Sequence, residues 1–185
     1  IFAEQEVTVD EEDHLAAWFE ALEETGAMSD DTLLTDDDRG RKELHALRHA
    51  VPAGINEIVV RNGMPKVGTD LSVPDSALPT MMDLYEQSPI RYALFGHIGD
   101  AHLHLNLLPR DADELARAKA FYDELAARAV ALGGSVSAEH GIGKLKKSHL
   151  RTMVGDDVLA QFRALKAQVD PAWILGRGNI VDRGL

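Results

Sequence analysis

Three histidines and one asparagine alternate with apolar residues in the segment 96–106, which holds a Gly99-Asp100 pair. A Gly-Asp pair between two alternating runs is typical of a tight β-hairpin turn, so His97 is predicted to lie opposite His102. Side chains alternate along a strand, and paired residues share a face. One face is therefore predicted to carry His97, His102, His104 and Asn106, and the other Leu94, Ile98, Leu103, Leu105 and Leu107.

A cluster of imidazoles on one face favours metal binding more than a single histidine does. One histidine on a strand usually has a structural role. With two or three on one hairpin face, metal binding and a structural role have about equal weight. Neutral imidazole is the commonest nitrogen ligand for zinc and its first-row neighbours. The chain contains no cysteine, which excludes thiolate ligands and disulfides, so the next ligand is expected to be a carboxylate.

A second chemically distinctive segment is 135–146, where Glu139 and His140 stand side by side before a Gly-x-Gly sequence. Glu139 is a candidate for the missing carboxylate ligand, and His140 would then lie beside the metal as a general base. The alternative is an ordinary turn between a strand and a helix. The Gly-x-Gly sequence is too short for a dinucleotide-binding fingerprint or a P-loop.

Arg48, Lys66 and Asp70 form a third group of charged residues. An arginine can bind a carboxylate through two parallel hydrogen bonds, which makes Arg48 a candidate for holding an acidic substrate. The alternative is that Arg48 is an ordinary surface residue on a helix.

These segments must be positioned by helices and strands. Helical spacing of apolar residues predicts helices over 10–26, 37–50, 76–86, 111–132 and 158–169. Extended patterns predict strands over 1–8, 32–35, 68–74, 91–98 and 102–108. Pro52 is expected to end the second helix, with loops over 53–67 around a short apolar run. Asp111 and Glu114 predict a capping-box start for the helix over 111–132.

The clearest strand pair is an antiparallel hairpin, and this sets the predicted fold class. We expect an α+β fold, with a mainly antiparallel sheet and helices packed on one face. The other face would carry the histidines, either exposed to solvent or as the floor of a pocket closed by another domain.

Length and charge limit the classes of function. The 185 residues are enough for one domain with a core, and the net charge is −12. Residues 1–50 hold 15 acidic and 4 basic side chains, so most of the negative charge lies there. An acidic chain without a basic patch argues against nucleic acid and anionic membranes as partners. No stretch approaches about 20 apolar residues, and a chain that starts at Ile1 is expected to belong to a longer protein.

Taken together, four segments resemble one family: 47–52, 66–74, 96–106 and 137–146. They are similar to the C-terminal domain of FAD-linked oxidases and dehydrogenases of 2-hydroxy acids. That family includes D-lactate dehydrogenases, D-2-hydroxyglutarate dehydrogenases and the FAD subunit of glycolate oxidase. The resemblance implies that residues 1–185 form a ferredoxin-like substrate and metal domain, and that the N-terminal FAD-binding domain is absent from this chain.

The resemblance also implies roles for individual residues. These are metal ligands His97, His104 and Glu139, base His140, and substrate-binding residues Arg48, Lys66 and Asn106. The implied cofactors are FAD, held mainly by the absent domain, and a divalent metal, with zinc and manganese expected. One departure is Ala101-His102, where the family often has Gly-Asn. His102 is then either a third imidazole near the metal or part of the pocket wall.

The expected activity is oxidation of a small 2-hydroxy acid, with hydride passing to FAD and the hydroxyl proton to His140. The expected partners are the hydroxy acid and an FAD domain in the same parent chain or in a partner subunit, with a homodimer left open. The chain alone is expected to be inactive. A cytoplasmic location is expected, with peripheral membrane contact through an electron acceptor as an alternative. Three other hypotheses about the function stay open: a metal-dependent hydrolase, a non-catalytic ferredoxin-like module that binds a metal or a partner, and a family member that works without metal.

Overall fold

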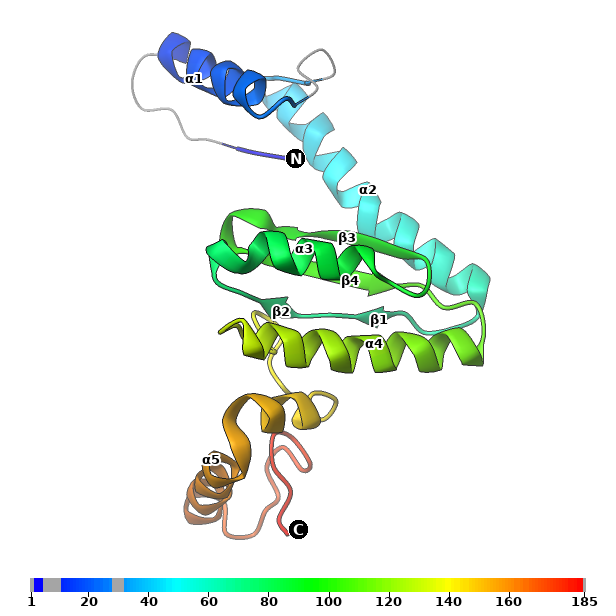
Figure 1. Cartoon of the computed structure of the whole chain (residues 1–185), viewed down its shortest axis with the longest axis vertical. Coiled ribbons are helices and arrows are strands. Elements are labelled where there is room, and N and C mark those ends of the chain that lie inside the picture. The colour runs from blue at the N-terminus through cyan, green and yellow to red at the C-terminus, as the bar shows by residue number, and fades with distance from the viewer. Residues whose placement is uncertain (1, 5–10, 28–31, 185) are drawn as a thin grey trace. The chain divides into compact units, whose positions relative to one another are not determined.

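The computed structural model describes residues 2–4, 11–27 and 32–184, and Figure 1 shows the whole chain. The chain divides into two compact units, residues 1–54 and 55–185. The first unit contains α1 (Glu11–Glu24) and the first part of α2 (Asp38–Asn62). The second unit contains the sheet and the remaining helices, and it holds both histidine segments.

The first unit agrees with the sequence in α1 and differs from it elsewhere. The predicted strand over 32–35 is wrong, because these residues form no strand. Residues 2–4 are not in a strand either, and the rest of the strand predicted over 1–8 lies largely outside the described residues. Helix α2 continues through Pro52, so the predicted break there is wrong.

The continuation of α2 has a physical reason. A proline inside a helix removes one hydrogen bond and costs about 3 kcal/mol. Beyond Pro52, however, Ile55, Ile58 and Val59 recur at helical spacing and turn away from solvent, and Ile55 is buried. Packing of this apolar stripe offsets the local defect, and the helix ends only before Gly63, whose φ of +65° suits a helix C-terminus.

The sheet of the second unit is antiparallel and centred on β4 (His102–Leu107). On one side β4 pairs with β3 (Tyr92–His97), and His97 lies opposite His102, as predicted. A 3₁₀ turn at Ile98–Asp100 joins the two strands, and the Ala101 N–H donates to the Ile98 carbonyl at 3.1 Å. The hairpin and its register are therefore confirmed.

Two short strands share the other edge of β4. They are β1 (Val67–Gly68) and β2 (Leu71–Ser72), and Figure 1 shows them in line. Val67 pairs with Leu107 and Leu71 with Leu103, so four residues separate the pairs on each strand and the register is continuous. The ladder is interrupted between them because the Leu105 N–H donates to the Thr69 hydroxyl at 3.0 Å instead of to a main-chain carbonyl.

One face of β4 belongs to the core. Leu103, Leu105 and Leu107 are buried in a cluster with residues of α3 (Leu78–Glu86) and α4 (Ala112–Ala131). At the start of α4 the Asp111 carboxylate accepts the Glu114 N–H at 2.8 Å, which confirms the predicted cap. An antiparallel sheet with helices on its apolar face confirms the α+β fold class. Ile98, predicted to face the core, is 47% exposed because the turn carries it past the end of the sheet.

The other face of β4 is covered by the loop that follows α4. Ser72 and Ser135 exchange main-chain hydrogen bonds, and the Ala138 N–H donates to the Asp70 carbonyl at 3.1 Å. Gly134 makes this approach possible, because a Cβ at that position would lie 2.1 Å from the Ser72 carbonyl oxygen. The histidine face is therefore partly enclosed rather than fully exposed.

The second unit ends in α5 (Lys147–Val169), which includes the helix predicted over 158–169. Gly155, with φ 76° and ψ 172°, kinks this helix. None of the helices in the described parts of the chain has the length and apolar character needed to cross a membrane.

Candidate metal and proton-transfer site

The carboxylate of Glu139 lies among four imidazoles. From the hairpin, His97 Nε2 lies 3.2 Å from Oε1 and His104 Nε2 lies 3.6 Å from Oε2. His102 Nδ1 lies 3.5 Å from Oε1, and His140 Nε2, from the loop itself, lies 3.5 Å from Oε2. The structure thus brings the two histidine segments together around one acid, although Glu139 lies at least 35 positions from the hairpin histidines in the sequence.

This cluster has donors that suit a divalent transition-metal ion. Ligand atoms about 2.1 Å from a tetrahedral zinc ion lie about 3.4 Å from one another, which matches the nitrogen–oxygen separations around Glu139. Two groups of three have their ligand atoms within 4.8 Å of one another: His102, His104 and Glu139, and Asp70, His104 and His140. His97, a predicted ligand, belongs to neither group, although it contacts Glu139.

His104 is oriented by the interrupted ladder described above. Its Nδ1 lies 3.0 Å from the carbonyl oxygen of Thr69. A carbonyl only accepts hydrogen bonds, so Nδ1 carries a proton, and in the neutral ring the lone pair is on Nε2, which faces Glu139. The Thr69 hydroxyl takes over the Leu105 N–H, which leaves the Thr69 carbonyl available to the histidine. An acceptor behind a metal-ligating imidazole fixes its tautomer and ring orientation.

Asp70 holds the loop segment in place. Its carboxylate accepts hydrogen bonds from the Glu139 N–H at 3.1 Å, the His140 N–H at 3.0 Å and the Ser137 hydroxyl at 3.0 Å. The Lys146 ammonium also donates to it, at 2.6 Å. Burial alone would raise the pKa of Asp70, but the Lys146 ammonium and the two main-chain N–H groups outweigh it and hold that pKa well below its usual range. Asp70 is thus a fixed anion that positions Glu139 and His140.

His102 is the most enclosed imidazole of the cluster, with a side chain only 5% exposed. Burial, and to a lesser extent the neighbouring His104, lower its pKa, which favours the neutral form of the ring. Its Nε2 lies 3.3 Å from Asp70 Oδ1 but makes no hydrogen bond.

His140 is the most exposed imidazole around Glu139. Its side chain is 62% exposed, and its ring stacks on that of His104 with centroids 5.0 Å apart and planes 7° from parallel. Its main-chain N–H is anchored on Asp70. The ring is therefore held at one edge of the cluster and open to solvent.

The predicted substrate-binding residues belong to both units. Lys66 Nζ donates to Asn106 Oδ1 at 2.9 Å, and Asn106 Nδ2 donates to the His104 carbonyl at 3.2 Å. This pair lies on the histidine face of the sheet, two residues along β4 from His104. Arg48 lies in the other unit, on α2, with its guanidinium 5.7 Å from the centre of the Phe2 ring. Its substrate role stays a prediction.

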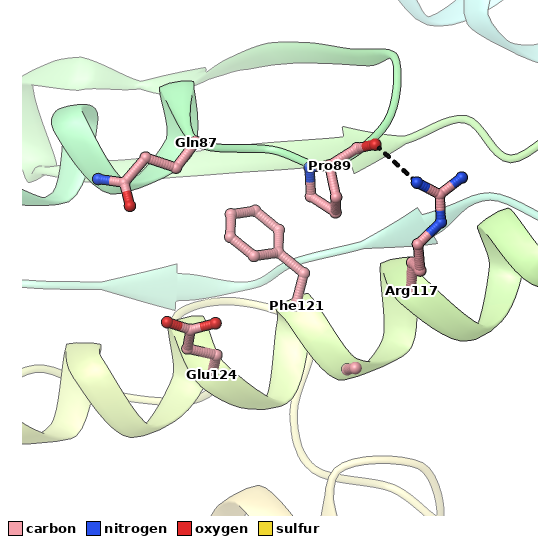
Figure 2. Close-up of a pocket in the computed structure, with 6 residues that line it drawn as sticks. Gln87, Pro89, Arg117, Phe121 and Glu124 are labelled. Carbon is pink, nitrogen blue, oxygen red and sulfur yellow. Dashed lines mark hydrogen bonds between the residues drawn. The ribbon is translucent and has the colours of Figure 1, made fainter.

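A separate depression lies beside α4, away from these residues (Figure 2). Its lining consists of Gln87, Pro89, Arg117, Ala120, Phe121 and Glu124. Arg117 closes one side by donating to the Pro89 carbonyl at 3.4 Å. No residue of the histidine cluster lines this depression, so it is not part of the candidate site.

The sequence indicated most of the cluster but missed its supports. Thr69, Ser137 and Lys146 received no role, and Asp70 was only noted as charged. The one available signal was the position of Asp70 in the extended segment 68–74, on the same strand face as the residues that pair with the histidines.

Comparison with known proteins gives the family. A model of the C-terminal domain of FAD linked oxidases matches residues 2–180. The chain belongs to this family. It is 34% identical over 154 residues to a protein of Danio rerio named as a probable mitochondrial D-lactate dehydrogenase, covering 80% of this chain and 30% of that protein.

Two further relatives carry related names. A D-2-hydroxyglutarate dehydrogenase of Xanthomonas citri pv. viticola is 34% identical over 178 residues, covering 90% of this chain and 36% of the relative. The glycolate oxidase subunit GlcD of Bacillus subtilis is 32% identical over 117 residues, covering 60% and 25%. The chain therefore spans about a third or less of the relatives it matches. The resemblance inferred from the four segments is confirmed.

Proposed function

We propose that this chain forms the substrate-binding and proton-accepting part of an FAD-linked enzyme that oxidises a small 2-hydroxy acid. The names of its relatives refer to lactate, 2-hydroxyglutarate and glycolate, which share a hydroxyl group next to a carboxylate. The observation that carries the proposal is the Glu139 carboxylate within 3.6 Å of both His97 and His104, with His140 at its edge. Family membership favours this function over a hydrolase or a non-catalytic module.

Two cofactors belong to the proposal. His97, His104 and Glu139 would hold a divalent ion such as zinc or manganese, which polarises the substrate hydroxyl and lowers its pKa. FAD, bound mainly by a part of the protein outside this chain, would accept the hydride from the carbon that carries the hydroxyl.

Lys66 binds the carboxylate of the substrate. Lys66 is exposed, and its ammonium donates to Oδ1 of the buried Asn106 at 2.9 Å, which orients it on the histidine face. Asn106 is linked in turn to the main chain of His104. A charge-assisted hydrogen bond from Lys66 therefore orients the acid so that its hydroxyl faces the histidines.

His140 accepts the hydroxyl proton. Its imidazole is open on one side and stacked on His104 on the other, while Asp70 fixes its main chain. A neutral imidazole can take a proton through its free ring nitrogen and then release it to solvent, which makes histidine the commonest general base.

The full-length protein loaded with FAD tests the proposal. D-lactate, glycolate and D-2-hydroxyglutarate are each mixed with it under anaerobic conditions, and bleaching of the flavin absorption is followed by stopped flow. At least one acid is expected to reduce the flavin, whereas the matched acid without a hydroxyl, propionate for lactate, is not. Absence of reduction by a wider panel of 2-hydroxy acids would refute the function.

A further inference from the structure

The position of His102 separates it from an ordinary residue of a pocket wall. It lies on the same strand face as His104, their ring centroids are 4.4 Å apart, and its Nδ1 faces Glu139 Oε1 at 3.5 Å. One ligand atom from each of these three residues lies within 4.8 Å of the other two. Such convergence of two imidazoles and a carboxylate is the donor set of a zinc-type centre.

His102 fits this centre more closely than His97 does. His97 is 50% exposed in its side chain and reaches Glu139 from the turn end of the hairpin, whereas the side chain of His102 is 5% exposed. His97 does not belong to the group of three residues, His102, His104 and Glu139, whose ligand atoms lie within 4.8 Å of one another. The enclosed part of the cluster is therefore built around His102, His104 and Glu139.

The surroundings of His102 repeat the arrangement seen behind His104. In each ring, the nitrogen that points away from Glu139 faces an acceptor. His104 Nδ1 faces the Thr69 carbonyl, and His102 Nε2 faces Asp70 Oδ1 at 3.3 Å. The His102 Nε2 is buried and has no hydrogen-bond partner, so a small rotation of the ring toward Asp70 would satisfy it. Its Nδ1 would then be unprotonated and would present a lone pair beside Glu139, as expected for a carboxylate–histidine–metal arrangement.

We propose that His102 is a third imidazole ligand, binding a divalent transition-metal ion through Nδ1 in addition to His97, His104 and Glu139. The inference rests on the proposed function and deepens it, because it names a further ligand and the ion that the site prefers. A third imidazole favours zinc, cobalt or copper over manganese and magnesium, which prefer oxygen ligands. The site is accordingly selective for a nitrogen-preferring ion.

Metal affinities of the metal-free chain test the proposal. Zn²⁺ and Mn²⁺ binding are each measured by competition with a chromophoric chelator, for the full 185-residue chain and for the His102→Asn variant. Asparagine keeps a polar group near Asp70 but removes the ring nitrogen. The variant is expected to bind Zn²⁺ about 100-fold more weakly and to change much less for Mn²⁺. The control variant His45→Asn, on α2, is expected to match the parent.

Cobalt absorption separates a lost ligand from a disturbed fold. The visible bands of bound Co²⁺ report its ligand set, so they are expected to shift in His102→Asn. Circular dichroism of each metal-free protein checks folding, and His102→Gln provides a second variant if asparagine unfolds the chain. Unchanged Zn²⁺ affinity and Co²⁺ bands in the folded variant, together with loss of binding in His104→Asn, would overturn the proposal and leave the proposed function intact. Failure of the parent chain to bind any of these ions would overturn both the third ligand and the metal part of that function, while flavin reduction by a hydroxy acid would still be tested separately.

Discussion

The main-chain carbonyl of Thr69 accepts a hydrogen bond from His104 Nδ1 at 3.0 Å, across the edge of the sheet. In a regular antiparallel pair this carbonyl would accept the N–H of Leu105. The Thr69 hydroxyl accepts that N–H instead. One threonine thus completes the sheet with its side chain and orients a histidine with its backbone.

Replacing Thr69 with valine is expected to weaken both the sheet at Leu105 and the orientation of His104. Valine has nearly the same shape but no hydroxyl, so the buried Leu105 N–H loses its acceptor at a cost of about 1–3 kcal/mol. Urea unfolding of the metal-free chain measures this loss. Thr69→Ser, which keeps the hydroxyl, is the matched control and is expected to lose less. Equal stability of the valine and serine variants would contradict the assignment.

Asp70→Asn is expected to destabilise the chain at neutral pH. It removes the anion that faces Lys146, whose side chain is only 12% exposed, and breaking such a pair costs about 3 kcal/mol. Because the folded-state pKa of Asp70 is lowered, its contribution is present above the unfolded value near 3.8 and is lost as the pH falls below it.

Unfolding curves of both proteins across pH, with a chelator present, check this dependence. The stability difference between the parent and Asp70→Asn should be largest at neutral pH and shrink in acid. A difference that stays constant from pH 7 down to about pH 2 would show that the carboxylate charge does not act in this way.

Glu139→Gln is expected to remove the bound metal with little effect on the fold. The change keeps the size of the side chain but removes the charge shared by the four imidazoles, and affinity for Zn²⁺ should fall by about 100-fold or more. Metal content after dialysis measures the loss. Glu86→Gln, an exposed residue at the end of α3, is the control and should retain the parent's metal content.

His140→Gln in the full-length enzyme is expected to lower kcat by about 10²–10⁴-fold, because it removes the proton acceptor. Metal content should be unchanged, which distinguishes this variant from Glu139→Gln. Rapid-kinetic flavin reduction with the preferred hydroxy acid gives the rate. A near-normal rate would assign the proton to another group.

Lys66→Gln is expected to raise KM for the hydroxy acid about tenfold while leaving kcat nearly unchanged. A hydrogen bond to a charged group contributes about 1.5–3 kcal/mol, and a carboxylate bond made equally in the ground and transition states affects binding alone. Lys66→Arg preserves the charge and should restore much of the affinity. A fall in kcat without a change in KM would assign Lys66 a different role.

The hairpin could be predicted because local signals determine it. The Gly99-Asp100 pair and the alternation of leucine and histidine fix both the turn and the pairing of His97 with His102. The same alternation determines which side chains of the hairpin lie on the face that meets Glu139. Site residues that follow from a strand period were therefore accessible from sequence.

The supports of the site could not be predicted in this way. The contacts of Asp70 with Glu139 and His140 span 69 and 70 residues. No periodic pattern encodes such contacts, because they depend on how the loop after α4 returns to the edge of the sheet. The passage of α2 through Pro52 was missed for a related reason: the packing of Ile55 outweighs a local preference.

The position of the segment that carries Glu139 and His140 depends on Gly134, a residue without a side chain. The residue carries no functional group and lies several positions before the acid and the base, yet a single added methyl group would meet the main chain of Ser72. A side chain at this position is therefore expected to displace the whole segment that carries Glu139 and His140, since that segment reaches its place by passing this close to Ser72.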